Sequence, residues 1–350
     1  MDGPVSKPVT LRQVAERAGI SASTASLVLN GKGDITQGTR DRVLAAAAEL
    51  GYAPKPSRTR SDATPTLRFL KLSKHGETVN RDHNHFISDY IDGMSHAATR
   101  RGYTLEVVAH EGLDMSVLSN TGDVQGQVIL GTELSEDDIQ ALSPDRHPTV
   151  FIDTYHRHLS ANFVDMDNDQ AVFEVVSHLK SARFERIGFV GSHSDVANFR
   201  LRDEAFRRAC ASLGIKVARQ DILSVAATRE GAYDQARQHL AEQDGIADAY
   251  FCVNDIVAHG LMRALQGLGH RIPGDVAVVG FDNLPMSSLL SPALSTVDVP
   301  KRQIGAMAVN LLDDIINSSR PQPPMKVLVT GRLIQRDSTG AKKRPGPAPA

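Results

Sequence analysis

The sequence is 350 residues long, with 41% hydrophobic and 23% charged residues and a formal net charge of −2. This length is too great for one small core and predicts two or three compact units, and the composition excludes a globally disordered chain. No apolar run approaches the roughly 20 residues that span a bilayer, and Met1–Val9 lacks the apolar core of a secretory signal. We therefore expect a cytoplasmic protein with no membrane partner.

The charge is unevenly distributed along the chain. The first 61 residues hold nine Lys and Arg against five Asp and Glu, a net charge of +4, so the remainder carries −6. A basic segment in front of an acidic body suits a polyanionic partner such as nucleic acid.

Two short helices are predicted at the start of the chain. Thr10 and Gln13 have the spacing of a capping box, and the helix that they begin ends at Gly19. A second helix starts at its N-cap Ser21 and ends at Asn30–Gly31. The positions expected on the inner faces are Leu11, Val14, Ala15 and Ala18 in the first helix and Thr24, Ala25, Val28 and Leu29 in the second. Two helices joined by one tight glycine turn indicate a helix-turn-helix.

A third helix is predicted from near Thr36 to Gly51. Its expected buried residues are Val43, Leu44, Ala47 and Leu50. Three helices of this size form one small core, which any small helical bundle would share. The glycine turn, the positive charge and the polar start of the second helix favour a DNA-binding domain.

The segments Thr10–Gly31, Thr39–Val43 and Glu49–Pro54 together resemble the DNA-binding head of the LacI/GalR family. The resemblance implies that double-stranded operator DNA is a partner and that the start of the second helix enters the major groove. Hydroxyl, amide and basic groups around it would lie near the phosphates and position the protein. The residues expected at base edges are Ala22, Ser23 and Leu27, and those expected near phosphates are Thr10, Ser21, Thr24, Ser26, Asn30, Thr39 and Arg58.

The chain departs from the family pattern at two places. Leu27 stands where family members usually carry an arginine, and leucine offers apolar contact, for instance to a thymine methyl, in place of bidentate contact to guanine. Residues 55–65 lack the leucine that wedges into the minor groove in the family. This segment is interpreted either as a flexible linker, with Arg58 and Arg60 near phosphate, or as an atypical hinge helix.

Short apolar runs alternate with amphipathic segments in the rest of the chain, which predicts parallel sheets with helices on both faces. The predicted strands are 67–72, 105–109, 127–130, 149–152, 187–190, 222–225, 250–253 and 276–280. The predicted helices are 86–101, 169–180, 202–213, 230–243, 255–268 and 301–317. A division near Phe163 separates two similar units, and ligand crevices form at the carboxyl ends of such strands.

Several segments of this body resemble the sensor of the same family, which is similar to periplasmic sugar-binding proteins. They are Asn84–Ile87, Val150–Asp153, Arg186–Gly191, Val253–Asp255, Val276–Asp282 and Arg332–Thr339. The resemblance implies a small all-α helix-turn-helix domain followed by an α/β two-lobed sensor that also forms a homodimer or a larger assembly. Closure of the lobes on an effector could then change the spacing of two DNA-binding heads.

The expected domain boundaries follow from this reading. The helix-turn-helix domain is 1–54, the linker 55–65, the effector-binding and dimerisation domain 66–339, and a disordered tail 340–350. The lobes are expected at about 66–163 with 300–322 and at 164–297 with 323–339, so that the chain crosses between them three times.

The resemblance also implies effector contacts in loops that follow predicted strands. The expected residues are Phe86, Asp153, Arg200, Asn254 and Asp282, joined by His193, which also follows a predicted strand. Charged and amide groups can satisfy several hydroxyls of one ligand, and Phe86 would form an aromatic wall. Each residue alone would equally fit a loop cap or a surface charge, whereas the set on corresponding loop ends favours a ligand pocket.

Further histidines and arginines follow predicted strands. They are His83, His85, His156, His158, Arg81 and Arg157. Such charge suits an anionic effector, a sugar phosphate or a sugar acid, unless these side chains are solvated residues at the lip of the cleft. No metal site is expected, because neither Cys nor Glu completes a recognisable spacing and Cys210 and Cys252 stand far apart.

The sequence lacks G-x-G-x-x-G, G-x-x-x-x-G-K-S/T and G-x-S-x-G, so we expect neither an enzyme nor a bound cofactor. The leading interpretation is a repressor of carbohydrate-use genes that is switched by a sugar or sugar derivative. The alternative is a regulator that responds to a purine or another non-sugar co-repressor; the absence of Trp and the 5% aromatic content favour a hydroxyl-rich ligand. A solute-binding protein or an enzyme on the same scaffold are further alternatives.

Overall fold

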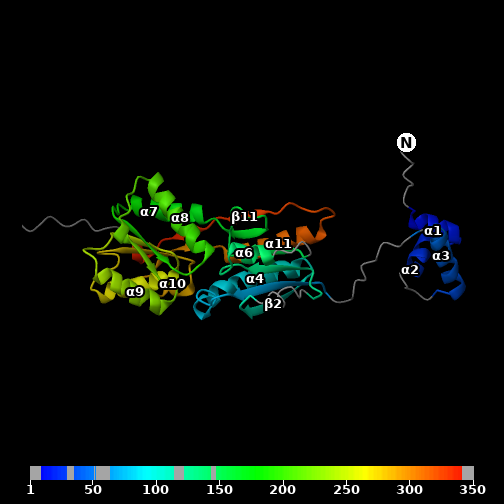
Figure 1. Ribbon diagram of the computed structural model, residues 1–350, viewed down its shortest axis with the longest axis horizontal. Helices are drawn as coiled ribbons and strands as arrows, with labels where there is room; N and C mark the ends of the chain where they lie inside the picture. The colour runs from blue at the N-terminus through cyan, green and yellow to red at the C-terminus, as the bar shows by residue number, and fades with distance from the viewer. Residues whose placement is uncertain are drawn as a thin grey trace, which may run out of the picture. The chain divides into compact units, whose positions relative to one another are not determined.

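The computed structural model describes residues 9–29, 35–50, 52, 64–113, 122–142 and 147–340. The chain divides into two compact units, Met1–Ala63 and Thr64–Ala350 (Figure 1). Asn30, Arg58, nearly all of the expected linker and the tail beyond Gly340 lie outside the described residues. No described helix is both long enough and apolar enough to cross a membrane.

The first unit consists of three helices whose ends follow local sequence signals. They are α1 (Leu11–Ala18), α2 (Ala22–Leu29) and α3 (Gln37–Leu50). The backbone N–H of Thr10 donates to Gln13 Oε1 at 2.8 Å and begins α1. Gly19 ends α1 with φ +68°, a left-handed conformation that favours glycine. Ser21 Oγ accepts from the N–H of Thr24 at 3.1 Å and caps α2.

The core of the first unit is small and is made of alanine and valine side chains. Its buried members are Val14, Ala15, Ala18, Ala25, Val28, Val43, Ala46 and Ala47. Leu44 was expected in this core but is 50% exposed, because Val43, Ala46 and Ala47 occupy the inward face of α3 and leave position 44 on the outer one.

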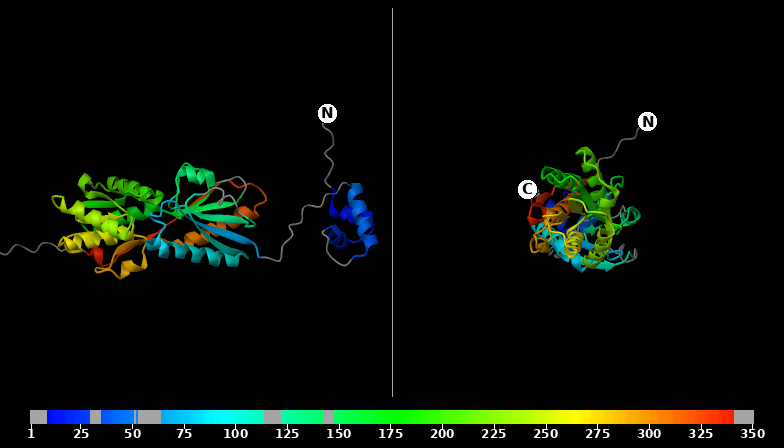
Figure 2. Two further views of the ribbon diagram at one scale, coloured as in Figure 1. Left: turned by 60° about the horizontal axis from the view of Figure 1, so that its bottom comes forward. Right: turned by 90° about the vertical axis from the view of Figure 1, so that its left-hand side faces the viewer.

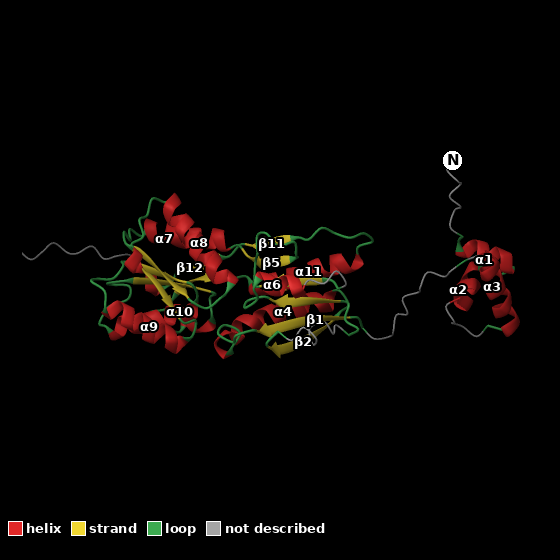
Figure 3. Ribbon diagram, in the orientation of Figure 1, coloured by secondary structure: helices red, strands yellow, loops and turns green. Residues whose placement is uncertain are grey.

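The second unit contains two lobes, each with a six-stranded sheet between helices (Figure 3). The sheet of the first lobe has the order β11-β5-β4-β3-β1-β2, and all its strands run parallel. Its strands are β1 (Thr66–Ser73), β2 (Thr104–Glu111), β3 (Gly126–Leu130), β4 (Thr149–Ile152), β5 (Phe163–Met166) and β11 (Lys326–Val329). Its helices are η1 (Arg81–His83), α4 (Asn84–Arg100), α6 (Glu136–Leu142) and α11 (Lys301–Asn317).

The sheet of the second lobe has the order β12-β10-β9-β8-β6-β7 and is parallel except for β12. Helices lie on both faces of this sheet (Figure 2, left view). Its strands are β6 (Ile187–Ser192), β7 (Ile222–Val225), β8 (Ala249–Cys252), β9 (Ala277–Phe281), β10 (Ser295–Asp298) and β12 (Arg332–Ile334). Its helices are α7 (Asn168–Ser181), α8 (Ala197–Ser212), η2 (Arg219–Asp221), α9 (Arg229–Ala241), α10 (Asp255–Gly267), η3 (Pro285–Ser288) and η4 (Asp337–Thr339).

The chain passes between the two sheets after β5, after β10 and after β11. Several boundaries differ from those expected. Residues 164–166 of β5 were expected in the second lobe, but β5 pairs with β4 in the first. The strand β11 was expected in the second lobe, but it pairs with β5 in the first because Lys326 to Val329 align with Phe163 to Met166. Helix α8 begins at Ala197, five residues before its expected start, because Asn198 and Arg200 interrupt the apolar pattern of its first turn.

Two glycines allow the backbones of α4 and α11 to approach closely. A Cβ atom at Gly93 would lie 2.1 Å from the carbonyl oxygen of Arg302, and one at Gly305 would lie 2.4 Å from that of Tyr90. These helices cover the same face of the first sheet and pack along one another. Their separation is therefore set by the absence of side chains at two positions.

Replacing Gly93 by alanine should destabilise the second unit by about 1–3 kcal/mol, because the added methyl group collides with backbone that cannot move alone. Chemical unfolding in urea measures the change. The matched control is Gly267→Ala at the end of α10, where an added Cβ meets no atom within 4 Å. Alanine there should be neutral or stabilising by up to about 1 kcal/mol. Equal stability of the two variants would contradict the close approach.

Candidate functional site

The start of α2 is the exposed polar part of the helix-turn-helix. Ser21, Ala22 and Ser23 are exposed, and Ser21 Oγ lies 2.8 Å from both Ser23 Oγ and Thr24 Oγ1. Leu27 is 43% exposed, whereas its neighbours on the other face of α2 are buried. Of the other residues expected at DNA, Thr10 is exposed and Thr24, Ser26 and Thr39 are half-buried. An exposed leucine among hydroxyls offers apolar contact beside hydrogen-bonding groups.

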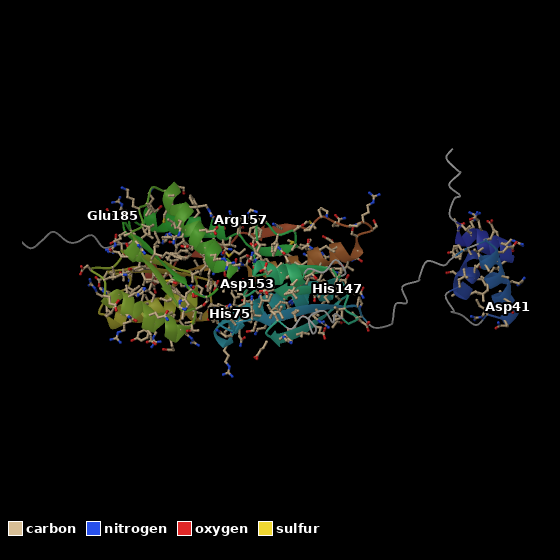
Figure 4. The ribbon with its side chains drawn as sticks, viewed as in Figure 1. Asp41, His75, His147, Asp153, Arg157 and Glu185 are labelled. Atoms are coloured by element: carbon tan, nitrogen blue, oxygen red, sulfur yellow. The ribbon has the colours of Figure 1, made fainter. Side chains whose placement is uncertain are left out.

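A cavity lies in the second unit at the carboxyl ends of the parallel strands, where the two lobes meet. The first lobe contributes Thr78, Val79, His83, Phe86, Ile87, Thr132 and Asp153. The second lobe contributes Val196, Asn198, Phe199, Arg202, Asn254 and Asp282. Figure 4 labels Asp153 at this junction. The cavity measures about 30 Å³, which is room for about two water molecules.

Four of the six residues expected at an effector line this cavity, namely Phe86, Asp153, Asn254 and Asp282. Arg200 and His193 do not. Both are exposed, and Arg200 pairs with Asp195 at the surface. The structure does not place Arg200 at the cavity: α8 begins earlier than predicted, and Arg202, half a helical turn further on, occupies the inward position.

Arg202 is the cation that the sequence reasoning missed. Its side chain is buried, Nε donates to Asn168 Oδ1 at 3.0 Å, and Nη1 donates to the carbonyl oxygen of Val253 at 2.8 Å. The guanidinium carbon stands 3.7 Å from the centre of the Phe281 ring. Helical spacing was the available signal, because Arg202 lies four residues after the buried Asn198 and on the same face.

Asp282 presents an unsatisfied oxygen beside this arginine. Its carboxyl is buried, and Oδ1 has no hydrogen-bond partner among the described residues, although it lies 3.5 Å from Arg202 Nη1. Burial raises the pKa of Asp282 to about 7, against the opposing effect of Arg202. The backbone φ of +114° turns this side chain away from the strand direction, and the backbone oxygen accepts from Lys301 Nζ at 2.6 Å.

Asp153 is held by donors from both lobes. Thr132 Oγ1 donates to Oδ2 at 2.5 Å, and Tyr90 and Asn198 donate to Oδ1 at 3.3 and 3.2 Å. Asn198 also donates to Oδ1 of the fully buried Asp165 at 3.4 Å. Burial, followed by the nearby charge of Asp153, raises the pKa of Asp165 to about 8. One amide from the second lobe thus joins two carboxyls of the first.

A second contact between the lobes joins His83 to Asn254. Asn254 Oδ1 accepts from the N–H of Val257 at 2.8 Å and caps α10, which makes its Nδ2 the donor toward His83 Nε2 at 3.3 Å. His83 Nδ1 in turn lies 3.2 Å from Asn80 Oδ1. A neutral imidazole that donates through Nδ1 and accepts at Nε2 satisfies both contacts.

The remaining histidines and arginines do not converge on the cavity. Arg81, His85 and His158 are exposed, His156 pairs with Glu136 at 3.2 Å, and Arg157 pairs with Asp169 and Glu204 on α7 and α8. Within the described part of the chain, Arg202 is the one Lys or Arg that lines the cavity. No cluster of three or more His, Cys, Asp or Glu among the described residues could hold a metal ion.

Asp165→Asn should remove a pH-dependent loss of stability. Because the pKa of Asp165 is raised in the folded state, its stabilising effect is complete below about pH 4 and is lost as pH rises toward 8. Asparagine keeps an oxygen for Asn198 and cannot ionise. Urea unfolding should therefore show the variant more stable than wild type at pH 8 by about 1 kcal/mol or more, with little difference at pH 4. The control is Asp234→Asn, an exposed position on α9, and an unchanged pH slope in Asp165→Asn would refute this assignment.

Comparison with known families places both units. Residues 10–55 match the family described as bacterial regulatory proteins, lacI family. Residues 176–339 match the periplasmic binding protein-like domain. Among solved structures, the lac repressor dimer bound to operator and the anti-inducer ONPF is similar with a TM-score of 0.70 at 24% identity, over 95% of this chain and 99% of that one. The complex of the transcriptional regulator CelR with cellobiose has a TM-score of 0.69 at 24% identity, over 94% and 99%.

Curated relatives extend this likeness over most of the sequence. The HTH-type transcriptional repressor PurR of Vibrio vulnificus is 30% identical over 316 residues, which cover 87% of this chain and 90% of the relative. PurR of Photobacterium profundum is 29% identical over 310 residues, with the same coverage. Both relatives are named as HTH-type transcriptional repressors. The chain therefore belongs to the lacI family of bacterial regulatory proteins and is a DNA-binding transcriptional repressor.

Proposed function

We propose that this repressor controls carbohydrate-use genes and that a neutral, hydroxyl-rich effector, a sugar or a sugar derivative, binds between its lobes and changes its affinity for operator DNA. The observation that carries the proposal is the buried, unsatisfied Oδ1 of Asp282 beside Arg202 in the cavity. A buried polar atom without a partner is costly, and a ligand that supplies the partner recovers that cost.

A hydroxyl group is the ligand atom that suits this pair. It can donate to the carboxyl of Asp282 and accept from Arg202 at the same time. An anion fits less well, because the carboxyls of Asp153 and Asp282 face the same small space as the single guanidinium. The arginines that suggested a sugar phosphate, Arg81 and Arg157, are exposed and lie outside the cavity lining, which favours a neutral sugar over its phosphate.

A purine is the second candidate, and one observation favours it. Phe86 from the first lobe and Phe199 from the second both line the cavity, so a planar ring could stack against aromatic side chains. The curated relatives are named as PurR repressors. The carboxyl and amide groups at the strand ends argue against a purine. They are more numerous than one planar ring with a few polar atoms would use.

The size of the cavity favours hinge motion as the switch. About 30 Å³ is far below the roughly 300–1,000 Å³ of pockets that enclose small ligands. Separation of the lobes about the three connections after β5, β10 and β11 would enlarge it. In a homodimer or a larger assembly, such motion would alter the distance between two helix-turn-helix units and so the affinity for a two-part operator.

Asp282→Asn should weaken the effector at least about tenfold and leave operator affinity without effector unchanged. Asparagine fills the same volume and tolerates a positive φ. It places an uncharged amide where the unpaired Oδ1 of the Asp282 carboxyl lies. Thermal shift with glucose, cellobiose, glucose 6-phosphate and hypoxanthine identifies the ligand class, because binding stabilises the folded protein. Calorimetry then gives the affinity of wild type and variant.

The matched control is Asp275→Asn, an exposed carboxylate of the same lobe that pairs with Arg271. It should bind the effector as wild type does. If hypoxanthine alone stabilises the protein, the effector is a purine and not a sugar. If glucose 6-phosphate binds more tightly than glucose, the effector is anionic. If Asp282→Asn and wild type bind the effector with equal affinity, Asp282 does not contact the effector.

Leu27→Ala tests the DNA surface. Leu27 is outside the small core, so its truncation should leave the fold intact while it lowers operator affinity about tenfold through lost apolar contact to a base. Its salt dependence should match wild type, because leucine contacts no phosphate. Fluorescence anisotropy on upstream DNA of the gene, at several salt concentrations, measures both. The control is Leu44→Ala, an equally exposed leucine on α3, and equal losses in the two variants would argue against base contact by Leu27.

A further inference from the structure

The loop after β1 is folded around a single buried carboxylate. Glu133, which follows β3 and is 2% exposed, accepts six hydrogen bonds from residues 74–79. Oε2 accepts from the N–H groups of Lys74, His75 and Gly76 at 2.8, 2.9 and 3.0 Å. Oε1 accepts from the N–H of Thr78 at 2.9 Å, its hydroxyl at 2.9 Å and the N–H of Val79 at 2.8 Å.

Two of the residues held in this way form a wall of the cavity. Thr78 and Val79 line it, and their N–H groups are donors to Glu133. Glu133 itself is absent from the lining. The preceding residue, Thr132, lines the cavity and holds Asp153 through its hydroxyl. Thr132 and Glu133, which follow β3, thus hold two parts of the cavity wall in the first lobe: Asp153, and the pair Thr78 and Val79.

We propose that Glu133 is a positioning residue for effector binding, which fixes residues 74–79 as a preformed wall of the cavity. The effect of Glu133 on effector binding rests on the proposed function. Its effect on the conformation of residues 74–79 does not. Five backbone amides donate to one carboxylate and leave the loop little freedom. Movement of the loop away from Glu133 would leave the N–H donors and the buried charge without hydrogen-bond partners.

The surroundings of the carboxylate support this role. The backbone donors lower the pKa of Glu133 to about 2, although burial alone would raise it. His75 Nδ1 accepts from the N–H of Glu77 at 3.2 Å, and Lys74 Nζ donates to Asp138 Oδ2 at 2.5 Å, so these side chains make further contacts within the first lobe. Asn80 Nδ2 donates to the carbonyl oxygens of Gly76 and Glu77 and closes the loop on its other side.

A consequence follows for how the cavity opens. Among the described residues, the side-chain hydrogen bonds that 74–79 make beyond the segment lie within the first lobe, to Ser73, Asn80, Glu133 and Asp138. The wall therefore travels with the first lobe. A ligand enters when the lobes separate, and the wall does not lift as a lid.

Hydrogen exchange of the full-length protein without ligand tests the inference, together with Glu133→Gln and Glu133→Asp. Glutamine has the shape of Glu133 but places an NH₂ group against N–H donors, so the amides of 74–79 should exchange at least about tenfold faster than in wild type. Aspartate keeps the charge on a shorter side chain and should give intermediate rates. Exchange in the strands of both sheets should stay at wild-type rates in either variant.

The matched control is Asp138→Asn, which removes a carboxylate that contacts the same loop through Lys74 but holds no wall residue. The backbone amides of 74–79 in Asp138→Asn should exchange at wild-type rates. Unchanged exchange at 74–79 in Glu133→Gln would overturn the proposal, and so would faster exchange spread evenly over the first lobe, which marks general destabilisation. If glutamine prevents folding, wild-type exchange rates in Glu133→Asp would overturn it in the same way.

Binding supplies the second readout. Glucose and hypoxanthine serve as probes, and whichever stabilises wild type should bind Glu133→Gln about tenfold more weakly and Asp138→Asn equally well. Equal affinity of wild type and Glu133→Gln, with the loop loosened, would overturn the role in binding. If neither compound stabilises wild type, the proposed effector classes fail, and the exchange rates alone decide whether Glu133 holds the wall.

Discussion

The buried guanidinium of Arg202 is the interaction on which the arrangement of the cavity depends. A permanent charge that is removed from water must be met by acceptors. Arg202 finds them on Asn168 at the first connection between the lobes, on the carbonyl of Val253 after β8 and beside Asp282 after β9. The ring of Phe281 covers its face. One side chain thus holds together two strand ends and the segment at the first connection between the lobes.

Several contacts between the described residues of the two lobes are polar. Asn198 reaches Asp153, Asn254 meets His83, and Lys301 donates to the backbone at position 282. Polar contacts of this kind have partners in water when they separate, so opening costs less than the exposure of an apolar interface would. Apolar side chains of both lobes belong to one continuous core, and the tight packing of α4 on α11 adds to the first lobe.

Much of the fold could be predicted because its signals are local. Thr10, Gly19 and Ser21 mark helix ends within one turn of the residues that they cap, and runs of buried apolar residues mark most central strands. The short strands at the connections were missed. The strand β11 has four residues with no strong periodicity, and its place beside β5 depends on a partner some 160 residues earlier.

The candidate site was predictable to the extent that parallel strands bring their carboxyl ends together. Asp153, Asn254 and Asp282 follow such strands, and a known strand order is enough to place them on one side. Arg202 and Glu133 could not be found in this way. Arg202 lies inside a helix whose first turn mixes apolar residues with Asn198 and Arg200. The carboxylate of Glu133 is satisfied by backbone donors 54 to 59 residues away, which have no sequence signature.

The sequence by itself determined where the helices and central strands lie, which residues form the helix-turn-helix and which family the chain resembles, because caps, periodicity and motifs act over a few residues. Only the tertiary structure decided which charges are buried together, that Arg202 and not Arg200 faces the cavity, and that a loop is closed on Glu133. The physical reason is that desolvation and pairing of charges depend on the distance in space between groups, which the order of residues does not set.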